Sequence, residues 1–381
     1  MSTPLSRLLQ PTLAMAVPPY LSKITSRQLK GFAFLLGLPT TGLKADLQNM
    51  LARRVAESPT RAQSSRILSI DMGIRNLGVC VLNAPRLSSS VQDATAMISS
   101  VTISAWEKVD VLAHLQAKTK STLGFGHSDS AVIERTELEH IRHRPDNALT
   151  AGDFTPQNLA EAAYALVCSL LVQYQPTDIL IERQRFRTFS GPAVQEWTLR
   201  VNLLEHMIWA CLETLRTTSR QDSADKSALG AAVRGVETVS EVSPAKVAKF
   251  WCSGVKQDLG PEMEKGAGML NMMSGTPAAL KITKADKIAV VQGWVDAWKT
   301  GSGADDSVRL DFAGEAAQTA GAFQSVQGKR KARKKKGEEG DDVDSIGKLD
   351  DLADCLLQGV AWVKWEENRR KLAETVAKNL D

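Results

Sequence analysis

The chain has 381 residues, of which 43% are hydrophobic and 24% are charged. This balance is ordinary for a soluble globular protein and excludes a fibrous or wholly disordered chain. No apolar run reaches the roughly 18 to 20 residues that span a bilayer, so no membrane partner is expected. The five cysteines include no CxxC pair, which excludes a disulfide framework and a structural zinc site and indicates a reducing compartment. The length predicts one large domain and a small module.

Charge is distributed unevenly along the chain. Residues 1–66 hold nine Lys or Arg and two acidic residues, so this part has a net charge of +7, and the remainder of the +4 chain has −3. A basic, acid-poor stretch containing Ser and Thr over residues 1–22 is compatible with an organelle transit peptide. An ordinary frayed terminus is the alternative.

Residues 23–57 are predicted to form two short helices. The first starts after Thr25, carries apolar residues at spacings of three and four, and ends at Gly37. The second covers about 43–55 and exposes its basic residues on the side away from its leucines. The following stretch, 58–66, is rich in polar residues and is interpreted as a linker.

The two helices resemble the SAP motif, a helix-extended-helix module that binds the DNA backbone. The resemblance rests on the spacing of apolar, glycine and basic residues at Leu36, Gly37, Leu38, Gly42, Lys44, Leu47 and Arg53. A chance helical hairpin is the alternative. Basic groups at helix ends suit phosphate contacts without base reading, so Lys44 and Arg53 are the candidate DNA-binding residues of this module.

Residues 67–375 are predicted to form one α/β domain in which helices flank a mixed sheet. Thr155 supplies an N-cap and Pro156 the first position of one of these helices. The predicted elements are strands 67–71, 77–82 and 101–106, helix 155–174, strand 178–184, helix 193–215, strand 236–242, a helix from Ser243, and helices 285–298 and 349–371. Segment 218–234 and the charged block 329–344 are interpreted as insertions, the latter solvated and disordered.

Five carboxylates occupy positions that suggest a common site. Asp71 and Glu182 each end an apolar strand, where an ionised carboxylate is costly unless it is paired or binds a metal. Asp350, Asp351 and Asp354 lie in the first turn of the last helix, and either Asp350 or Asp351 can face the sheet together with Asp354. Singly, these acids have structural explanations in turns, ion pairs or the helix dipole. Together, their hard oxygen atoms predict a site for two Mg²⁺ or Mn²⁺ ions and for phosphodiester hydrolysis.

Three motifs in order resemble the fungal mitochondrial Holliday-junction resolvases, which belong to the RuvC-like branch of the ribonuclease H-like fold. The motifs are Ser69-Ile70-Asp71-Met72-Gly73-Ile74-Arg75-Asn76, Ile181-Glu182-Arg183-Gln184-Arg185-Phe186-Arg187 and Leu349-Asp350-Asp351-Leu352-Ala353-Asp354. The resemblance covers residues 67–365 in element order, and the SAP-like preface also occurs in that family. It implies a ribonuclease H-like fold. It also implies Asp71, Glu182, Asp351 and Asp354 as catalytic metal ligands, with Asp350 as a further candidate.

The same resemblance implies a function. A homodimer is expected to cut four-way DNA junctions in mitochondrial recombination, leaving 5′-phosphate and 3′-hydroxyl ends, without a small-molecule cofactor. Basic residues beside the site are expected to bind phosphates, namely Arg75, Arg183, Arg185 and Arg187, although exposed arginines also form surface ion pairs. The expected location is the mitochondrial matrix, with residues 1–22 as the presequence. The basic run 329–336 alone suggests a nuclear alternative.

Two rival functions remain open at this stage. One is a ribonuclease acting on RNA:DNA hybrids with the same metals, and the other is a non-catalytic junction-binding architectural protein. Trp197 and Trp209, together with Leu203 and Leu204, are predicted to form either core or a subunit interface rather than a base-stacking platform. The five histidines lack metal-ligand spacing and are not expected to bind zinc.

Overall fold

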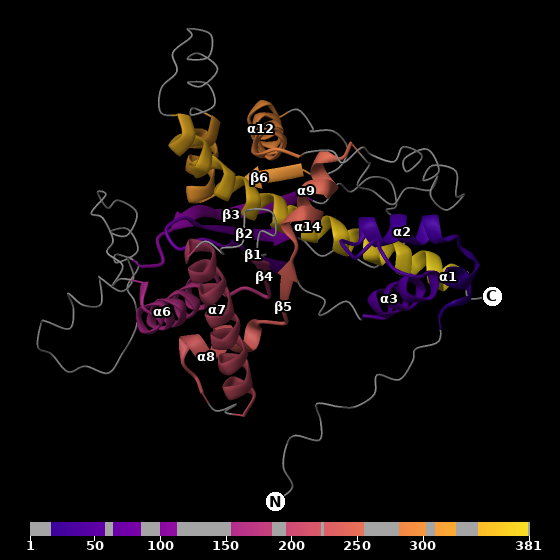
Figure 1. Cartoon of the computed structure of the whole chain (residues 1–381), viewed down its shortest axis with the longest axis horizontal. Helices are drawn as coiled ribbons and strands as arrows, with labels where there is room; N and C mark the ends of the chain where they lie inside the picture. Colours follow the sequence, from indigo (N-terminus) through magenta and orange to yellow (C-terminus); the bar gives the residue numbers. More distant parts are fainter. Residues whose placement is uncertain are drawn as a thin grey trace, which may run out of the picture. The chain divides into compact units, whose positions relative to one another are not determined.

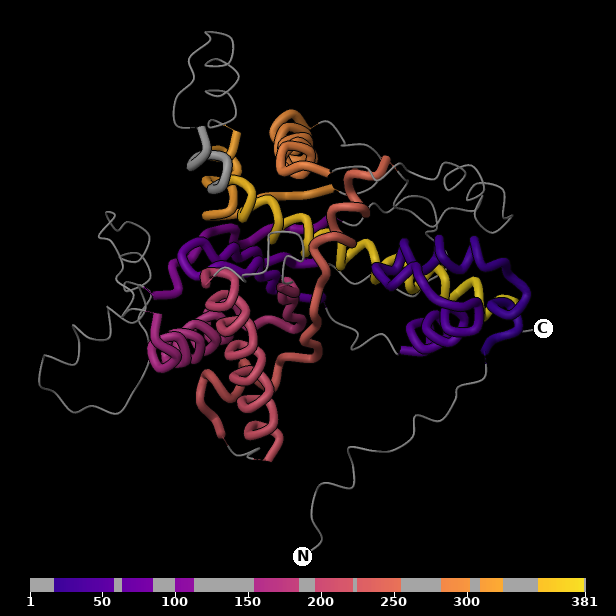
Figure 2. Tube along the Cα trace, viewed as in Figure 1, coloured from indigo at the N-terminus to yellow at the C-terminus, as the bar shows by residue number. Residues whose placement is uncertain are grey.

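The computed structural model describes residues 17–57, 64–84, 100–112, 154–184, 196–221, 225–254, 282–301, 309–324 and 342–379. The chain divides into two compact units, whose elements can be followed in Figure 1 and along the Cα trace in Figure 2. The sheet unit comprises Arg61–Gly254 and Leu280–Ala361, and the helical unit takes its described residues from Met1–Thr60 and Trp362–Asp381. Among the described residues, no helix is both long and apolar enough to cross a lipid bilayer.

A mixed sheet of six strands forms the centre of the sheet unit. The strands are β1 (Ser65–Asp71), β2 (Leu77–Ala84), β3 (Ser100–Val109), β4 (Asp178–Glu182), β5 (Thr238–Val242) and β6 (Arg309–Phe312). They lie in the order β5-β4-β1-β2-β3-β6. Strand β2 is antiparallel to both of its neighbours, and the other pairs are parallel. The predicted ribonuclease H-like α/β class, with its initial hairpin, is confirmed.

Helices cover both faces of this sheet. They are α6 (Pro156–Tyr174), α7 (Glu196–Gln221), α8 (Ala228–Gly235), α9 (Pro244–Cys252), α12 (Lys284–Thr300) and α14 (Asp342–Lys378), of which the last continues into the helical unit. Figure 1 shows α6, α7 and α8 together on one face, with α14 along the other. The predicted cap of α6 is confirmed, because the Thr155 hydroxyl accepts a hydrogen bond from the Asn158 amide at 3.2 Å.

Alternate residues of the central strands face opposite helix layers, as the pleat requires. Leu68 and Ile70 of β1 belong to the apolar core that β1 shares with α6 and α7. Ser69 faces the opposite way, and its Oγ donates a hydrogen bond to the Cys355 carbonyl oxygen in α14 at 2.7 Å. Asp71 follows two residues later on the same face as Ser69. The strand periodicity therefore directs Asp71 towards α14.

The helical unit contains α1 (Pro19–Lys23), α2 (Ser26–Leu35), α3 (Lys44–Ala56) and the end of α14. Thr25 and Gln28 form a capping box at the start of α2. The Asn368 side chain of α14 donates a hydrogen bond to the Leu35 carbonyl oxygen at 3.1 Å. Gly37, with φ of +66°, lies against the ring of Trp365. The end of α14 thus completes this unit, whereas the sequence placed residues up to 375 in the nuclease domain.

Three features of the fold differ from the sequence-based expectation. Strand β6 was not predicted; it extends the sheet beside β3, where Phe312 packs on Trp106 with ring centroids 5.7 Å apart. Helix α8 lies in the segment interpreted as an insertion, yet it contributes Ala232 and Val233 to the main core. Within the charged block, α14 already begins at Asp342, and residues 325–341 lie outside the described residues.

Candidate active site

Asp71 and Glu182 lie at the same end of two neighbouring strands. Strands β1 and β4 run parallel and pair Ile70 with Ile181, so the residues that follow are neighbours. Asp71 is only 8% exposed, and its carboxyl group interacts electrostatically with that of Glu182. The apolar residues preceding them lie in the core. The sheet therefore brings both acids together, with Asp71 buried and Glu182 partly buried.

Helix α14 approaches the sheet closely at the residues that carry its aspartates. A Cβ atom on Gly78 of β2 would lie 2.6 Å from the backbone oxygen of Asp351, a distance that only glycine permits without displacement. Trp106 of β3 donates a hydrogen bond from Nε1 to the Leu352 carbonyl oxygen at 2.8 Å. These contacts dock α14 beside Asp71.

The acids oppose one another's ionisation. Burial, then Glu182 and, after it, Asp354 and Asp351, raise the pKa of Asp71 well above its ordinary value. Burial is also the main cause that raises the pKa of Asp351 to about 6 and that of Asp354 to about 7. Strongly perturbed carboxyl groups of this kind are concentrated at functional sites. A cation bound among them would relieve the repulsion.

These pKa values predict a pH-dependent stability of the metal-free protein. An acid whose pKa is higher in the folded state stabilises the fold at low pH and loses that contribution as the pH rises through the folded pKa. For Asp354 this window runs from 3.8 to about 7. We expect the Tm measured in EDTA to fall between about pH 4 and pH 7, and Asp354→Asn to reduce the slope. An unchanged slope in the variant would contradict this origin.

Asp350 forms ion pairs with two lysines of α12, and its charge also raises the pKa of Asp351 and of Asp354. Its carboxylate lies 2.7 Å from Nζ of Lys284 and 3.2 Å from Nζ of Lys287. Lys287 also forms an ion pair with Asp354. The sequence left open whether Asp350 or Asp351 faces the sheet. Asp351 is close enough to Asp71 to raise its pKa, whereas the Asp350 carboxylate has Lys284 and Lys287 as its ion-pair partners.

Sequence reasoning missed several polar neighbours of the cluster. Besides the two lysines of α12, Gln184 donates hydrogen bonds from Nε2 to Glu182 at 3.2 Å and from its backbone amide to Glu205 at 3.1 Å. Glu205 is buried within α7, and burial raises its pKa. Its position on the apolar face of that helix was a signal available in the sequence. No comparable sequence signal marked the two lysines, because their ion pairs depend on how α12 packs.

The donor set fits a divalent cation in its chemistry. Asp71, Glu182, Asp351 and Asp354 offer the hard carboxylate oxygens that Mg²⁺ or Mn²⁺ prefers. As they stand, no three His, Cys, Asp or Glu side chains within the described ranges are grouped as metal ligands. Instead, Lys287 forms an ion pair with Asp354. A metal held by all four acids would have to compete with Lys287 for the Asp354 carboxylate.

The basic residues expected beside the site have different surroundings. Arg75 is exposed in the turn after β1. Arg183 forms a 3.2 Å ion pair with Glu241, and the two side chains are 38% and 59% exposed, in agreement with the ion-pair alternative. Arg185 and Arg187 lie outside the described residues.

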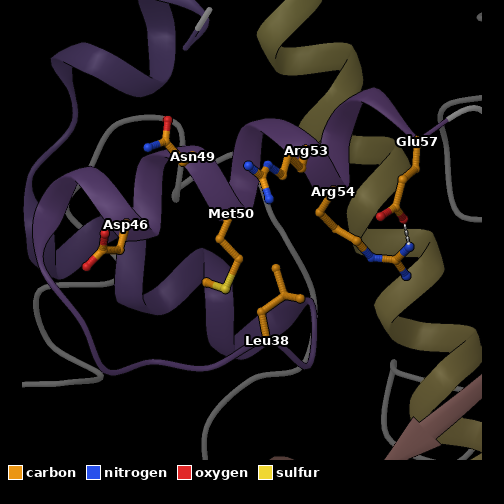
Figure 3. A pocket seen from close by; sticks show the side chains of 7 residues that line it. All are labelled: Leu38, Asp46, Asn49, Met50, Arg53, Arg54 and Glu57. Atoms are coloured by element: carbon orange, nitrogen blue, oxygen red, sulfur yellow. Dashed lines mark hydrogen bonds and ion pairs between the residues drawn. The ribbon is translucent and has the colours of Figure 1, made fainter. Parts of the chain in front are cut away.

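A hollow on the helical unit has two neighbouring arginines, Arg53 and Arg54, in its lining, and these differ in their surroundings. It is lined by Leu38, Asp46, Asn49, Met50, Arg53, Arg54 and Glu57. Figure 3 shows Arg54 directed at Glu57, and Arg54 also pairs with Glu366 of α14. Arg53 is exposed, as is Lys44 at the start of α3. Arg54 is thus tied into the fold, while Arg53 and Lys44 face solvent.

A mixed sheet in this strand order, with acids from β1, β4 and α14 gathered at one end, defines a ribonuclease H-like protein with an acidic site. The chain belongs to the family described as mitochondrial resolvase Ydc2 / RNA splicing MRS1, whose model matches residues 67–372. The resemblance found in the sequence motifs is thereby confirmed.

Three individual proteins are similar to the chain. The chain is 32% identical over 177 residues to the mitochondrial cruciform cutting endonuclease 1 of Schizosaccharomyces pombe. The aligned region covers 46% of this chain and 50% of that protein. It therefore spans about half the length of this curated relative. The solved yeast mitochondrial Holliday junction resolvase Ydc2 aligns at 20% identity with a TM-score of 0.49, covering 93% of this chain and 98% of that one. Thermus thermophilus RuvC aligns at 14% identity with a TM-score of 0.25, covering 62% and 97%.

Proposed function

We propose that the protein is a structure-selective endonuclease that resolves four-way DNA junctions in mitochondria. The observation that carries the proposal is the cluster of the buried Asp71 and the partly buried Glu182, Asp351 and Asp354, which come from three separate elements of the fold. Family membership supports the same reading, as does the S. pombe relative, which is named a cruciform cutting endonuclease.

The four acids would hold two Mg²⁺ or Mn²⁺ ions. Bound ions of this kind activate a water molecule and stabilise the leaving oxygen in phosphodiester hydrolysis. The chain itself holds the carboxylates at the junction of sheet and helix, where they are buried or partly buried. Lys287 balances part of their charge before metal and substrate arrive. Water oxygen joins phosphorus and the bond to the 3′ oxygen breaks, which leaves 5′-phosphate and 3′-hydroxyl ends.

Cleavage of synthetic substrates distinguishes this proposal from its rivals. We expect the full chain to cut a four-way junction in Mg²⁺, not in EDTA, and to leave linear duplex and RNA:DNA hybrid intact. Cleavage of the hybrid would favour the ribonuclease alternative. Binding of the junction without cleavage in any divalent metal would favour the architectural alternative.

A homodimer would supply two incisions on opposite strands of one junction. Its proposed interface lies on α7, where Trp197, Leu199 and Leu203 remain 44%, 50% and 38% exposed. Leu204, from the same predicted group, is fully buried and belongs to the core. Light scattering should give twice the chain mass of 41.4 kDa.

Phosphate contacts by the helical unit should appear in the salt dependence of binding. Deleting the unit is an unsuitable test, because α2 and α3 pack with the end of α14. We expect Lys44→Gln with Arg53→Gln to lower the slope of log affinity against log salt by about 2, roughly 1 for each lost contact. Arg27→Gln, on the neighbouring helix α2, is the control for a general loss of positive charge. An unchanged slope would remove the DNA-binding role of the two residues.

A further inference from the structure

Gln358 is a polar side chain buried between α14 and the sheet. It is 3% exposed. Its Nε2 donates hydrogen bonds to Ser69 Oγ at 3.1 Å and to the carbonyl oxygens of Ile70 and Leu180 at 3.2 and 3.4 Å. A single amide group therefore connects α14 to both β1 and β4.

These partners lie beside the proposed metal ligands in the chain. One carbonyl belongs to the residue immediately before Asp71, and the other lies two residues before Glu182. Gln358 itself follows Asp354 by four residues, about one helical turn. The amide thus contacts β1 and β4 within two residues of Asp71 and Glu182, and on α14 it lies about one turn from Asp354.

Ser69 closes the network between β1 and α14. Its hydroxyl accepts from Gln358 and donates to the Cys355 carbonyl oxygen. A buried amide costs free energy unless it is hydrogen-bonded, and an apolar side chain of similar size would fill the same space without that cost. Packing alone therefore does not account for a glutamine at this position.

We propose that Gln358 is a positioning residue that sets the separation between the strand acids, Asp71 and Glu182, and the helix acids, Asp351 and Asp354. The inference rests on the proposed nuclease function and deepens it. Gln358 touches neither substrate nor metal in this role. It holds the backbone segments whose relative position decides whether the four carboxylates can share the same ions.

Other contacts keep α14 docked when this link is lost. Trp106 of β3 donates to the Leu352 carbonyl oxygen, and Trp251 of α9 donates to that of Leu357 at 2.9 Å. Neither β3 nor α9 carries a proposed ligand. Removing the Gln358 amide should consequently leave the fold in place while loosening α14 against β1 and β4. Misplacement of catalytic groups by about 1 Å can cost about a hundredfold in rate.

The test compares Gln358→Leu with Trp251→Phe in the full-length chain. Both variants remove one buried side-chain donor to the α14 interface, but only the first breaks the link to the strands that carry Asp71 and Glu182. Thermal unfolding, junction affinity in EDTA, Mn²⁺ affinity by calorimetry and the Mg²⁺ dependence of single-turnover cleavage are measured for each.

We expect Gln358→Leu to weaken Mn²⁺ binding and to slow cleavage, each by about 10- to 100-fold, the range found for residues that orient metal ligands. Junction affinity should stay near that of the wild type. Trp251→Phe should lower the Tm by a similar amount, with Mn²⁺ affinity and cleavage close to those of the wild type. Ser69→Ala should show a smaller loss than Gln358→Leu, and the double variant should lose less than the sum of the two, because both belong to one network.

Equal Mn²⁺ affinity and cleavage in Gln358→Leu and Trp251→Phe would overturn the positioning role. If Gln358→Leu does not fold, Ser69→Ala decides the question by the same measurements. A wild-type protein that binds Mn²⁺ but does not cut junctions would refute the proposed function alone. The effect of the variants on Mn²⁺ affinity would then still decide whether Gln358 positions the acids.

Discussion

Asp71→Asn is expected to abolish junction cleavage while leaving junction binding near normal. The substitution is almost isosteric, and the apolar neighbours Leu68 and Ile70 remain packed in the core. It removes a negative charge from the centre of the acidic cluster, where Asp71 interacts with Glu182, Asp351 and Asp354. Loss of a direct metal ligand should slow cleavage at least as much as loss of a residue that orients such a ligand. We therefore expect the single-turnover rate to fall by about a hundredfold or more.

The same variant should be more stable than the wild type in the absence of metal. Burial and the neighbouring acids raise the pKa of Asp71 well above its ordinary value, so ionisation of Asp71 destabilises the fold at high pH, and asparagine removes that cost. The Tm in EDTA at pH 8 should rise, and the increase in Tm that Mg²⁺ gives the wild type should shrink.

Asp178→Asn is a matched control for this experiment. Asp178 starts β4 and is as buried as Asp71, at 8% exposed. It accepts hydrogen bonds from the hydroxyls of Thr177 and Thr238, at the opposite end of the strand from Glu182. Its substitution should lower the Tm and leave cleavage unchanged. Wild-type cleavage by Asp71→Asn in Mg²⁺ would show that the metal assignment is wrong and would favour the architectural alternative.

The central strands and long helices were predictable because their signals are local. β1 alternates between the two helix layers, and α6 begins at a Thr-Pro cap. β6 was missed because its four residues include the acidic Asp311, and it joins the sheet through pairing with β3, a partner far away in sequence. α8 was missed because it is short and follows a polar stretch, although its alanine and valine residues enter the core.

The acidic residues of the site could be predicted, but their partners could not. Asp71 and Glu182 could be predicted because each ends an apolar strand. The ion pairs of Lys287 depend on the packing of α12 against α14, which no short-range pattern encodes. Gln358 occupies a core position of α14, and its significance follows only from the strands that it contacts.

Gly78→Ala is expected to damage the site from a position that carries no functional group. The new Cβ would lie 2.6 Å from the Asp351 backbone oxygen and 3.2 Å from the Cβ of Asp71. Backbone cannot yield as a flexible side chain does, so α14 must move away from β2 at the point where the helix acids meet the strand acids. We expect a loss of about 1–3 kcal/mol in the free energy of unfolding. Cleavage should slow by about a hundredfold.

Gly293→Ala separates this displacement from the general effect of replacing a glycine. Gly293 lies inside α12, and a Cβ there would meet no atom within 4 Å. Alanine at a free helical position should stabilise the protein by about 0.5–1 kcal/mol and leave cleavage unchanged. Thermal unfolding and single-turnover rates of both variants test the pair. If Gly78→Ala loses stability but cuts junctions at the wild-type rate, then the distance between α14 and β2 does not control the catalytic geometry.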